Sequence, residues 1–134
     1  MDLLDKYLNC LKNRRADYLI TLFSSDSSMI GTTENEVAKG IVQIIELHEA
    51  AWKQSKNYEL EVTRVIHKGD RFIVAECQAI FSRKIIDKDE DIEEVIIEDG
   101  LRVTIIGNTF GNIGHLHISV PDARLEDGQI FSFP

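Results

Sequence analysis

The chain has 134 residues, of which 43% are hydrophobic and 28% charged, and these proportions predict one soluble globular domain over residues 1–134. The formal net charge of −8 argues against nucleic acid or an anionic membrane surface as a partner, because both attract a basic surface. No apolar run approaches about 18 residues and no signal-peptide pattern is present, so we expect no membrane span and a cytoplasmic location.

Three helices are predicted in the first part of the chain. In Asp2–Arg14 the apolar residues recur at helical spacing, and Asp2 is a suitable N-cap. A shorter helix is predicted over Asp17–Phe23 and ends at the turn-forming residues Ser24–Ser27. The most regular helix is Ile41–Gln54, and one of its faces carries Ile41, Ile44, Ile45, His48 and Trp52.

A short strand, Ser28–Ile30, and a helical turn are predicted between the second and third helices. Thr33 and Glu36 have the spacing of a capping box, and Gly40 ends the turn. Glu34 and Glu36 could instead be catalytic bases, but capping and exposure to solvent explain these two residues better.

From Tyr58 onward apolar and polar residues alternate, which is typical of β-strands. Strands are predicted over Tyr58–His67, Arg71–Arg83, Val95–Ile106 and Ile113–Val120, and the loop Asp87–Asp91 separates the second from the third. This order predicts an α+β fold, in which three N-terminal helices pack on one face of a curved, mostly antiparallel sheet of four to six strands.

Three stretches resemble the SnoaL-like and nuclear transport factor 2-like superfamily, which has a cystatin-like α+β cone fold. Asp17–Phe23, followed by Asp26, is similar to its "D…LF..D" segment, Gly31–Gly40 to its "GT..E..G" connection, and Gly114–Pro121 to its closing "H.H.S.P" strand. The resemblance implies a cone-shaped pocket. Members include a steroid isomerase, polyketide cyclases, small hydrolases and a kinase association domain, so the fold leaves the function open.

The steroid isomerase branch needs a carboxylate base and two oxyanion donors, a Tyr and a protonated Asp. Counting without gaps places Tyr7 at the Tyr position, but Gly31 at the base and Val103 at the Asp. Two of the three groups are absent, so we expect no ketosteroid isomerisation and assign no catalytic residue.

Four residues are predicted to bind a ligand in the pocket: Tyr7, Trp52, Arg64 and Arg102. Tyr7 and Trp52 would contact an apolar body. Arg64 shares a strand face with apolar residues, so it must be paired, line a cavity or reach water from the strand end. Arg102 lies in a stretch similar to a family "R.T" pattern whose Arg can enter the pocket. The two arginines predict an anionic group on the ligand, above all if Glu76 points away from the core.

His115 and His117 are two residues apart in a strand and therefore point to the same side. They could form a metal pair or an acid–base dyad. No third ligand with suitable spacing stands out, although His48, His67 or an acidic residue could join them through space, and we predict no metal and no cofactor. The core side of this strand is expected to carry Leu116, Ile118 and Val120. The histidines are therefore expected on the outer sheet face, where a second copy covers them in a homodimer.

Cys10 and Cys77 are isolated cysteines without a CxxC motif, and we predict that both are reduced and at least half buried. The small residues Ala75, Cys77 and Ala79 on one strand face would leave room for a cavity beneath the third helix.

These features predict a small-molecule-binding domain, non-catalytic or weakly catalytic, whose ligand the sequence does not name. Two alternatives stay open. One is a SnoaL-like enzyme of the cyclase, isomerase or hydrolase type that uses Glu76 or a histidine, and the other is a homo-association module. A dry cavity ringed by polar groups favours the first two functions, and a filled one favours association.

Overall fold

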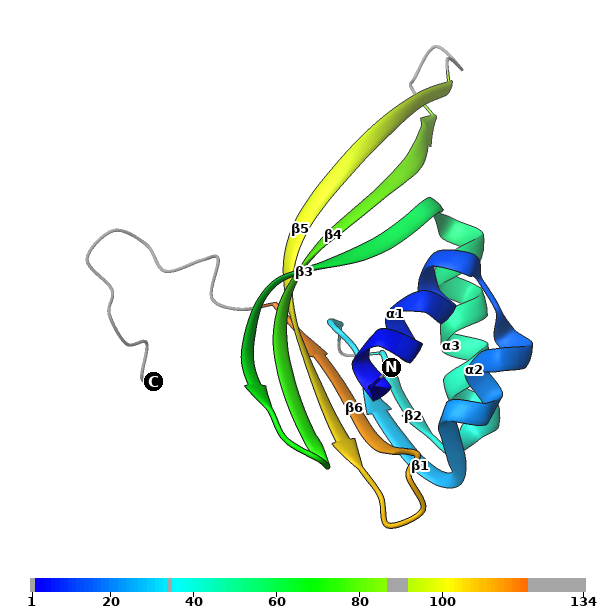
Figure 1. Ribbon diagram of the computed structural model, residues 1–134. Coiled ribbons are helices and arrows are strands. Elements are labelled where there is room, and N and C mark those ends of the chain that lie inside the picture. The colour runs from blue at the N-terminus through cyan, green and yellow to red at the C-terminus, as the bar shows by residue number, and fades with distance from the viewer. Residues whose placement is uncertain (1, 34, 87–91, 121–134) are drawn as a thin grey trace, which may run out of the picture.

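A computed structural model describes residues 2–33, 35–86 and 92–120, without the side chains of residues 83–86 and 92–99. Over these residues, three helices lie on the concave side of one curved sheet of six strands (Figure 1). The helices are α1 (Leu3–Asn13), α2 (Ala16–Leu22) and α3 (Ile41–Gln54). The strands are β1 (Phe23–Ile30), β2 (Val37–Lys39), β3 (Lys56–Lys68), β4 (Phe72–Ile86), β5 (Ile92–Gly107) and β6 (Ile113–Ser119).

The strands follow the order β2-β1-β6-β5-β4-β3 across the sheet. β1 runs parallel to β6, and the other neighbouring pairs are antiparallel. The predicted α+β fold is therefore confirmed. The predicted loop Asp87–Asp91 lies outside the described residues. Within them, no helix is both long and apolar enough to cross a membrane.

The end of α1 is tied to the end of α3. Asp2 caps the start of α1 by accepting a hydrogen bond from the Asp5 N–H, as predicted, and Arg14 ends the helix with a left-handed φ of 52°. The Arg14 guanidinium donates to the carbonyl oxygens of Trp52 at 2.7 Å and Ser55 at 2.5 Å. A cation at the negative end of a helix dipole is stabilising, so Arg14 holds two helices at a fixed separation.

The turn predicted at Ser24–Ser27 is wrong, because these residues belong to β1. Ser27 is buried, and its hydroxyl donates to the carbonyl oxygen of Ile113 at 2.6 Å. The Ser24 N–H donates in turn to the Ser27 hydroxyl. The Ser27 hydroxyl thus finds a partner on β6, and β1 pairs with β6 on both sides of these residues, at Phe23 and again from Ser28.

The helical turn predicted from Thr33 is also wrong, because β1 and β2 form a hairpin there. Ile30 pairs with Val37, and the Gly31 N–H donates to the carbonyl oxygen of Glu36 at 2.6 Å. The capping box is not formed. The Glu36 carboxylate instead accepts a hydrogen bond from the Thr32 N–H at 2.9 Å.

The concave face of the sheet is apolar and packs on the helices. Ile73, Ile105, Leu116 and Met29 form one row across four strands, and Ala75, Val103 and Ile118 form the next. All seven side chains are buried, as are Cys77 and Ala79. The predicted inward facing of the small residues of β4 is therefore confirmed.

Arg64 does not share this face, which corrects the expectation from regular alternation. Val62 pairs with Cys77 and Arg64 with Glu76, so Thr63 is an extra residue between two consecutive pairs. Such a β-bulge turns the following side chain to the other face of the sheet. The Arg64 side chain is consequently 67% exposed on the convex side.

Candidate functional site

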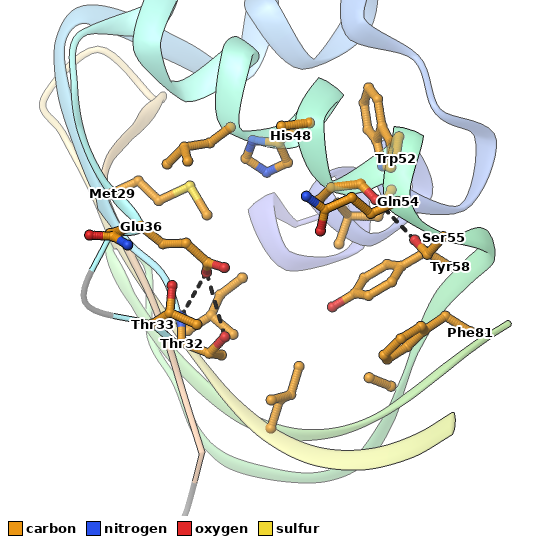
Figure 2. A pocket seen from close by; sticks show the side chains of 18 of the residues that line it. Met29, Thr32, Thr33, Glu36, His48, Trp52, Gln54, Ser55, Tyr58 and Phe81 are labelled. Carbon is orange, nitrogen blue, oxygen red and sulfur yellow. Dashed lines mark hydrogen bonds between the residues drawn. The ribbon is translucent and has the colours of Figure 1, made fainter. Parts of the chain in front are cut away.

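A cavity of about 600 Å³ lies between the helices and the concave face of the sheet (Figure 2). α1 and α3 contribute one wall, the strands the opposite wall, and the β1–β2 loop one side. Its apolar lining comprises Leu11, Met29, Leu47, Ala50, Ala51, Ala79, Leu101 and Ile118. Its aromatic lining comprises Tyr7, Trp52, Tyr58 and Phe81. The predicted cone-shaped pocket is thus present, with small residues of β4 and α3 in its walls.

Tyr7 and His48 form a buried polar pair in the cavity wall. Ile44, His48 and Trp52 recur at i, i+4 and i+8 and are all buried on the same face of α3. His48 Nδ1 lies 2.7 Å from the Ile44 carbonyl oxygen, which can only accept, so Nδ1 carries the proton. Burial lowers the pKa of His48 and keeps the ring neutral, which leaves Nε2 as an acceptor.

The Tyr7 hydroxyl therefore donates to His48 Nε2, at 2.8 Å. Tyr7 is fully buried, and burial holds its pKa well above the ordinary value. The phenol is a neutral group whose proton is already engaged. It therefore has no free proton to donate to a second group.

Aromatic rings form two groups in the lining. His48 stands 6.0 Å from Trp52 in a T-shaped arrangement, centroid to centroid. Tyr58 and Phe81 are 5.4 Å apart. Figure 2 shows His48 and Trp52 on α3, with Tyr58 and Phe81 on the side of the cavity away from Glu36. Such rings suit an apolar or cationic ligand.

Glu36 brings a carboxylate into the cavity because of the hairpin geometry. Side chains alternate along a strand, so residues 29 and 31 share one face, and their cross-strand partners 38 and 36 share it too. Met29 and Ala38 are buried on the concave side, and Glu36 points the same way. A β-carbon at Gly31 would collide with the Glu36 carboxylate, so only glycine fits opposite this side chain.

The four residues predicted to bind a ligand divide into two pairs. Tyr7 and Trp52 line the cavity, and their contact with a ligand stays a prediction. Arg64 and Arg102 are absent from its described lining. Both lie on the convex face, where their guanidinium groups bind the Glu76 carboxylate at 2.9 Å and 3.2 Å.

Glu76 therefore points outward and is at the same time the partner of Arg64, which corrects the expectation that an outward Glu76 leaves this Arg without a carboxylate. The hydrogen bond from Arg102 and the charge of Arg64 lower the pKa of Glu76. Arg102 Nε is buried and lacks a hydrogen-bond partner in the described part of the chain. The prediction of an anionic ligand rested on Arg64 and Arg102, and neither guanidinium group lies in the cavity.

Side chains alternate along β6 as predicted. His115 and His117 lie on the convex face, whereas Leu116 and Ile118 are buried on the concave face. Val120, expected on the core side, is 46% exposed beyond the end of β6. The Ser28 hydroxyl lies 2.7 Å from His115 Nδ1, and the two imidazole rings are 6.3 Å apart. Among the described residues, no three His, Cys, Asp or Glu side chains come together as a metal site.

Sequence reasoning considered His48 only as a ligand that could join His115 and His117 through space, and it explained Glu36 as a cap. The signal for Glu36 is the period of two along Glu36, Val37 and Ala38, which becomes visible only once this segment is recognised as a strand. His48 stands on the apolar face of α3, but its partner Tyr7 is 41 residues away, and no local pattern joins them.

Three helices on a curved sheet with a lined cavity define an α+β cone fold of the SnoaL-like and nuclear transport factor 2-like class. Residues 1–106 match the SnoaL-like domain, and the chain belongs to this family. No curated protein matches the chain.

Solved structures of the same fold come from several bacteria. A candidate SnoaL-like polyketide cyclase from Shewanella putrefaciens is 17% identical, with a TM-score of 0.73 over 87% of this chain and 85% of that one. An epoxide hydrolase from M. tuberculosis is 13% identical, with a TM-score of 0.65 over 87% and 78%. A protein from Catenulispora acidiphila with a ketosteroid isomerase-like fold, in complex with trimethylamine, is 13% identical, with a TM-score of 0.65 over 87% and 82%. At these identities the likeness concerns the fold alone.

Proposed function

We propose that this SnoaL-like domain binds a small molecule with a mainly apolar body in the cavity between α1, α3 and the sheet. The observation that carries the proposal is the cavity itself: about 600 Å³, with apolar and aromatic walls and a few polar groups at fixed positions. This combination is typical of small-molecule sites. Side chains do not fill the space, which weighs against a domain that serves association alone.

Binding is favoured over proton-transfer catalysis by the state of the polar groups. An enzyme that abstracts a proton needs donors for the anion that forms. Tyr7 already donates its proton to His48. Val103, to which the gap-free count assigns the second donor of the isomerases, is a fully buried apolar residue. A base without two such hydrogen-bond donors would leave the negative charge that develops on the substrate unstabilised.

An acid–base enzyme is the second candidate, and one observation supports it. The Glu36 carboxylate occupies the space that a side chain at Gly31 would take. The gap-free count assigns the base of the isomerase branch to this same position. Glu36 therefore brings a carboxylate to this place from the neighbouring strand. Glu76, the base named from the sequence, lies on the convex face. Turnover that is lost in Glu36→Gln, at unchanged ligand affinity, would support the enzyme.

Binding can be followed through Trp52, since it is the only tryptophan of the chain and lines the cavity. We expect neutral apolar probes such as Nile red to change its emission and to saturate. Ala79→Leu should weaken this binding, because Ala79 lines the cavity and a larger side chain reduces its volume. Gln78→Leu is the matched control, since the neighbouring side chain points to the convex face. Equal effects of both variants, or no saturable binding, would contradict the proposal.

A further inference from the structure

We infer that the cavity selects a ligand with a cationic amine, which the Glu36 carboxylate and the aromatic lining hold together. The inference rests on the proposed binding function and adds the chemical class of the ligand. It also reverses the charge expected from Arg64 and Arg102, because both guanidinium groups lie on the other side of the sheet.

The charge of the lining is the first argument. Among the described residues that line the cavity, Glu36 is the only Asp, Glu, Lys or Arg. Its Oε2 accepts hydrogen bonds from the Thr32 N–H and hydroxyl, at 2.9 Å and 3.5 Å. Its Oε1 accepts none from the part of the chain that the structure describes, so one carboxylate oxygen is available to a ligand. A charged donor is the strongest partner for such an oxygen.

The direction of the hydrogen bonds is the second argument. Because His48 Nδ1 donates to the Ile44 carbonyl, the Tyr7 proton is directed to His48 Nε2, and this buried pair has no proton to offer to a ligand. Glu36 likewise requires a donor on the ligand. A carboxylate or phosphate would find no donor in the Tyr7–His48 pair and would be repelled by Glu36.

The aromatic rings are the third argument. Trp52, Tyr58 and Phe81 line the same cavity as Glu36, and Figure 2 places Tyr58 and Phe81 across it from the carboxylate. The face of an aromatic ring attracts a cation, tryptophan most strongly, and rings around an ammonium group also provide apolar contact for its carbon substituents. A carboxylate on one side and rings on the other therefore match a substituted ammonium group on an apolar body.

The test compares three ligands that share one apolar body and differ in the head group: adamantylamine, adamantanol and adamantane carboxylate. Their affinities are measured by Trp52 emission near neutral pH, where the amine is charged. We expect the amine to bind at least about tenfold more tightly than the alcohol, and the carboxylate most weakly. In Glu36→Gln the amine should fall to within about twofold of the alcohol, while the affinity for the alcohol stays unchanged.

Two controls separate the role of Glu36 from general effects. The amide oxygen of Gln at position 36 can still accept from the Thr32 N–H, so an unchanged unfolding midpoint establishes that the loop is intact. Glu49→Gln removes the same charge from an exposed position of α3 outside the described lining and should keep the preference for the amine. A preference lost equally in both variants would overturn the inference.

The outcomes also distinguish this inference from the proposed function. Saturable binding of Nile red, with an amine that binds no more tightly than the alcohol, overturns the charge selection and leaves the pocket as a binding site. A preference for the amine that survives Glu36→Gln overturns the role of Glu36. Failure of Nile red and of all three adamantanes to bind contradicts the proposed function itself.

Discussion

The hydroxyl of Tyr7 lies 2.8 Å from Nε2 of His48, and this bond joins α1 to α3 across the wall of the cavity. Both residues are buried, and the second imidazole nitrogen is held by the Ile44 carbonyl. The pair therefore fixes the ring of His48 and the separation of the two helices at this point. Its loss should be measurable in the stability of the whole domain.

We expect Tyr7→Phe to lower the free energy of unfolding by about 1–3 kcal/mol, because it leaves His48 Nε2 buried without a donor. Tyr18→Phe is the matched control. Tyr18 is 40% exposed, and its change should stay within about 0.5 kcal/mol. Urea unfolding of both variants measures the difference. Similar losses in the two proteins would mean that the bond to His48 contributes little.

The stability should fall as the pH drops below about 6.5. Burial lowers the pKa of His48, and burial with the nearby His117 lowers the pKa of His115. Below the ordinary histidine pKa, the unfolded chain therefore binds more protons than the folded chain. The contribution of these histidines to the free energy of unfolding is fully present above the ordinary pKa. It is lost as the pH falls toward the lowered pKa values of the folded state. Carboxylates whose pKa is lowered, such as Glu76, reduce the stability only when the pH falls below about 4.5.

Urea unfolding between about pH 8 and pH 5.5 tests this dependence. His48→Gln and His115→Gln should each reduce the slope of unfolding free energy against pH, and the double variant should reduce it further. A slope that is unchanged in the double variant would place the titrating groups elsewhere.

Both cysteines should be unreactive in the folded protein. Cys10 and Cys77 are free and buried, as predicted, and burial raises the pKa of Cys10 and brings that of Cys77 to about 11. The thiolate is the reactive form, so a colorimetric disulfide reagent near pH 8 should modify native protein slowly and denatured protein at both thiols. Fast modification of native Cys77 would indicate that the core between the helices and the sheet opens.

The cluster of Arg64, Glu76 and Arg102 on the convex face gives an asymmetric prediction. Arg64→Leu leaves the bond between Arg102 and Glu76 intact, whereas Glu76→Gln removes the charged partner of both guanidinium groups. We therefore expect the larger drop in melting temperature for Glu76→Gln. Acetate that raises the melting temperature of the wild type but not of Arg64→Leu would instead support an anion site at Arg64.

We propose that two copies of the chain associate through the convex face, since the helices cover the other one. Ile30, Phe72 and Ile106 are each about 40% exposed there, next to His115 and His117. Half-exposed apolar side chains on an uncovered sheet face are typical of an association surface.

Sedimentation at tens of micromolar protein should show a dimer that Ile106→Glu dissociates. Val42→Glu, on the 66% exposed surface of α3, is the control and should leave the dimer intact. Acidification should also weaken association, because protonation of His115, whose pKa burial lowers, places a positive charge at the interface. A monomeric wild type would contradict the proposal.

Local periodicity determined most of the fold. The apolar spacing of Ile41–Gln54 predicted α3 with the bounds that the structure has. The alternation in β6 placed Leu116 inside and His117 outside, because a side chain in a strand faces one of only two directions. The order of the predicted elements, with helices first and strands after them, then led to the α+β class and to the cavity between its two layers.

Tertiary pairing decided the features that local periodicity does not contain. An extra residue at Thr63 turned Arg64 out of the core, and β1 continued through Ser24–Ser27 between two places where it pairs with β6. Glu36 reached the cavity because a hairpin set it opposite Gly31. A bulge, a register and a partner strand are relations between residues that are distant in the sequence. The carboxylate inside the cavity therefore depends on which strands pair and in which register. The residue spacing that predicted the strands does not contain this information.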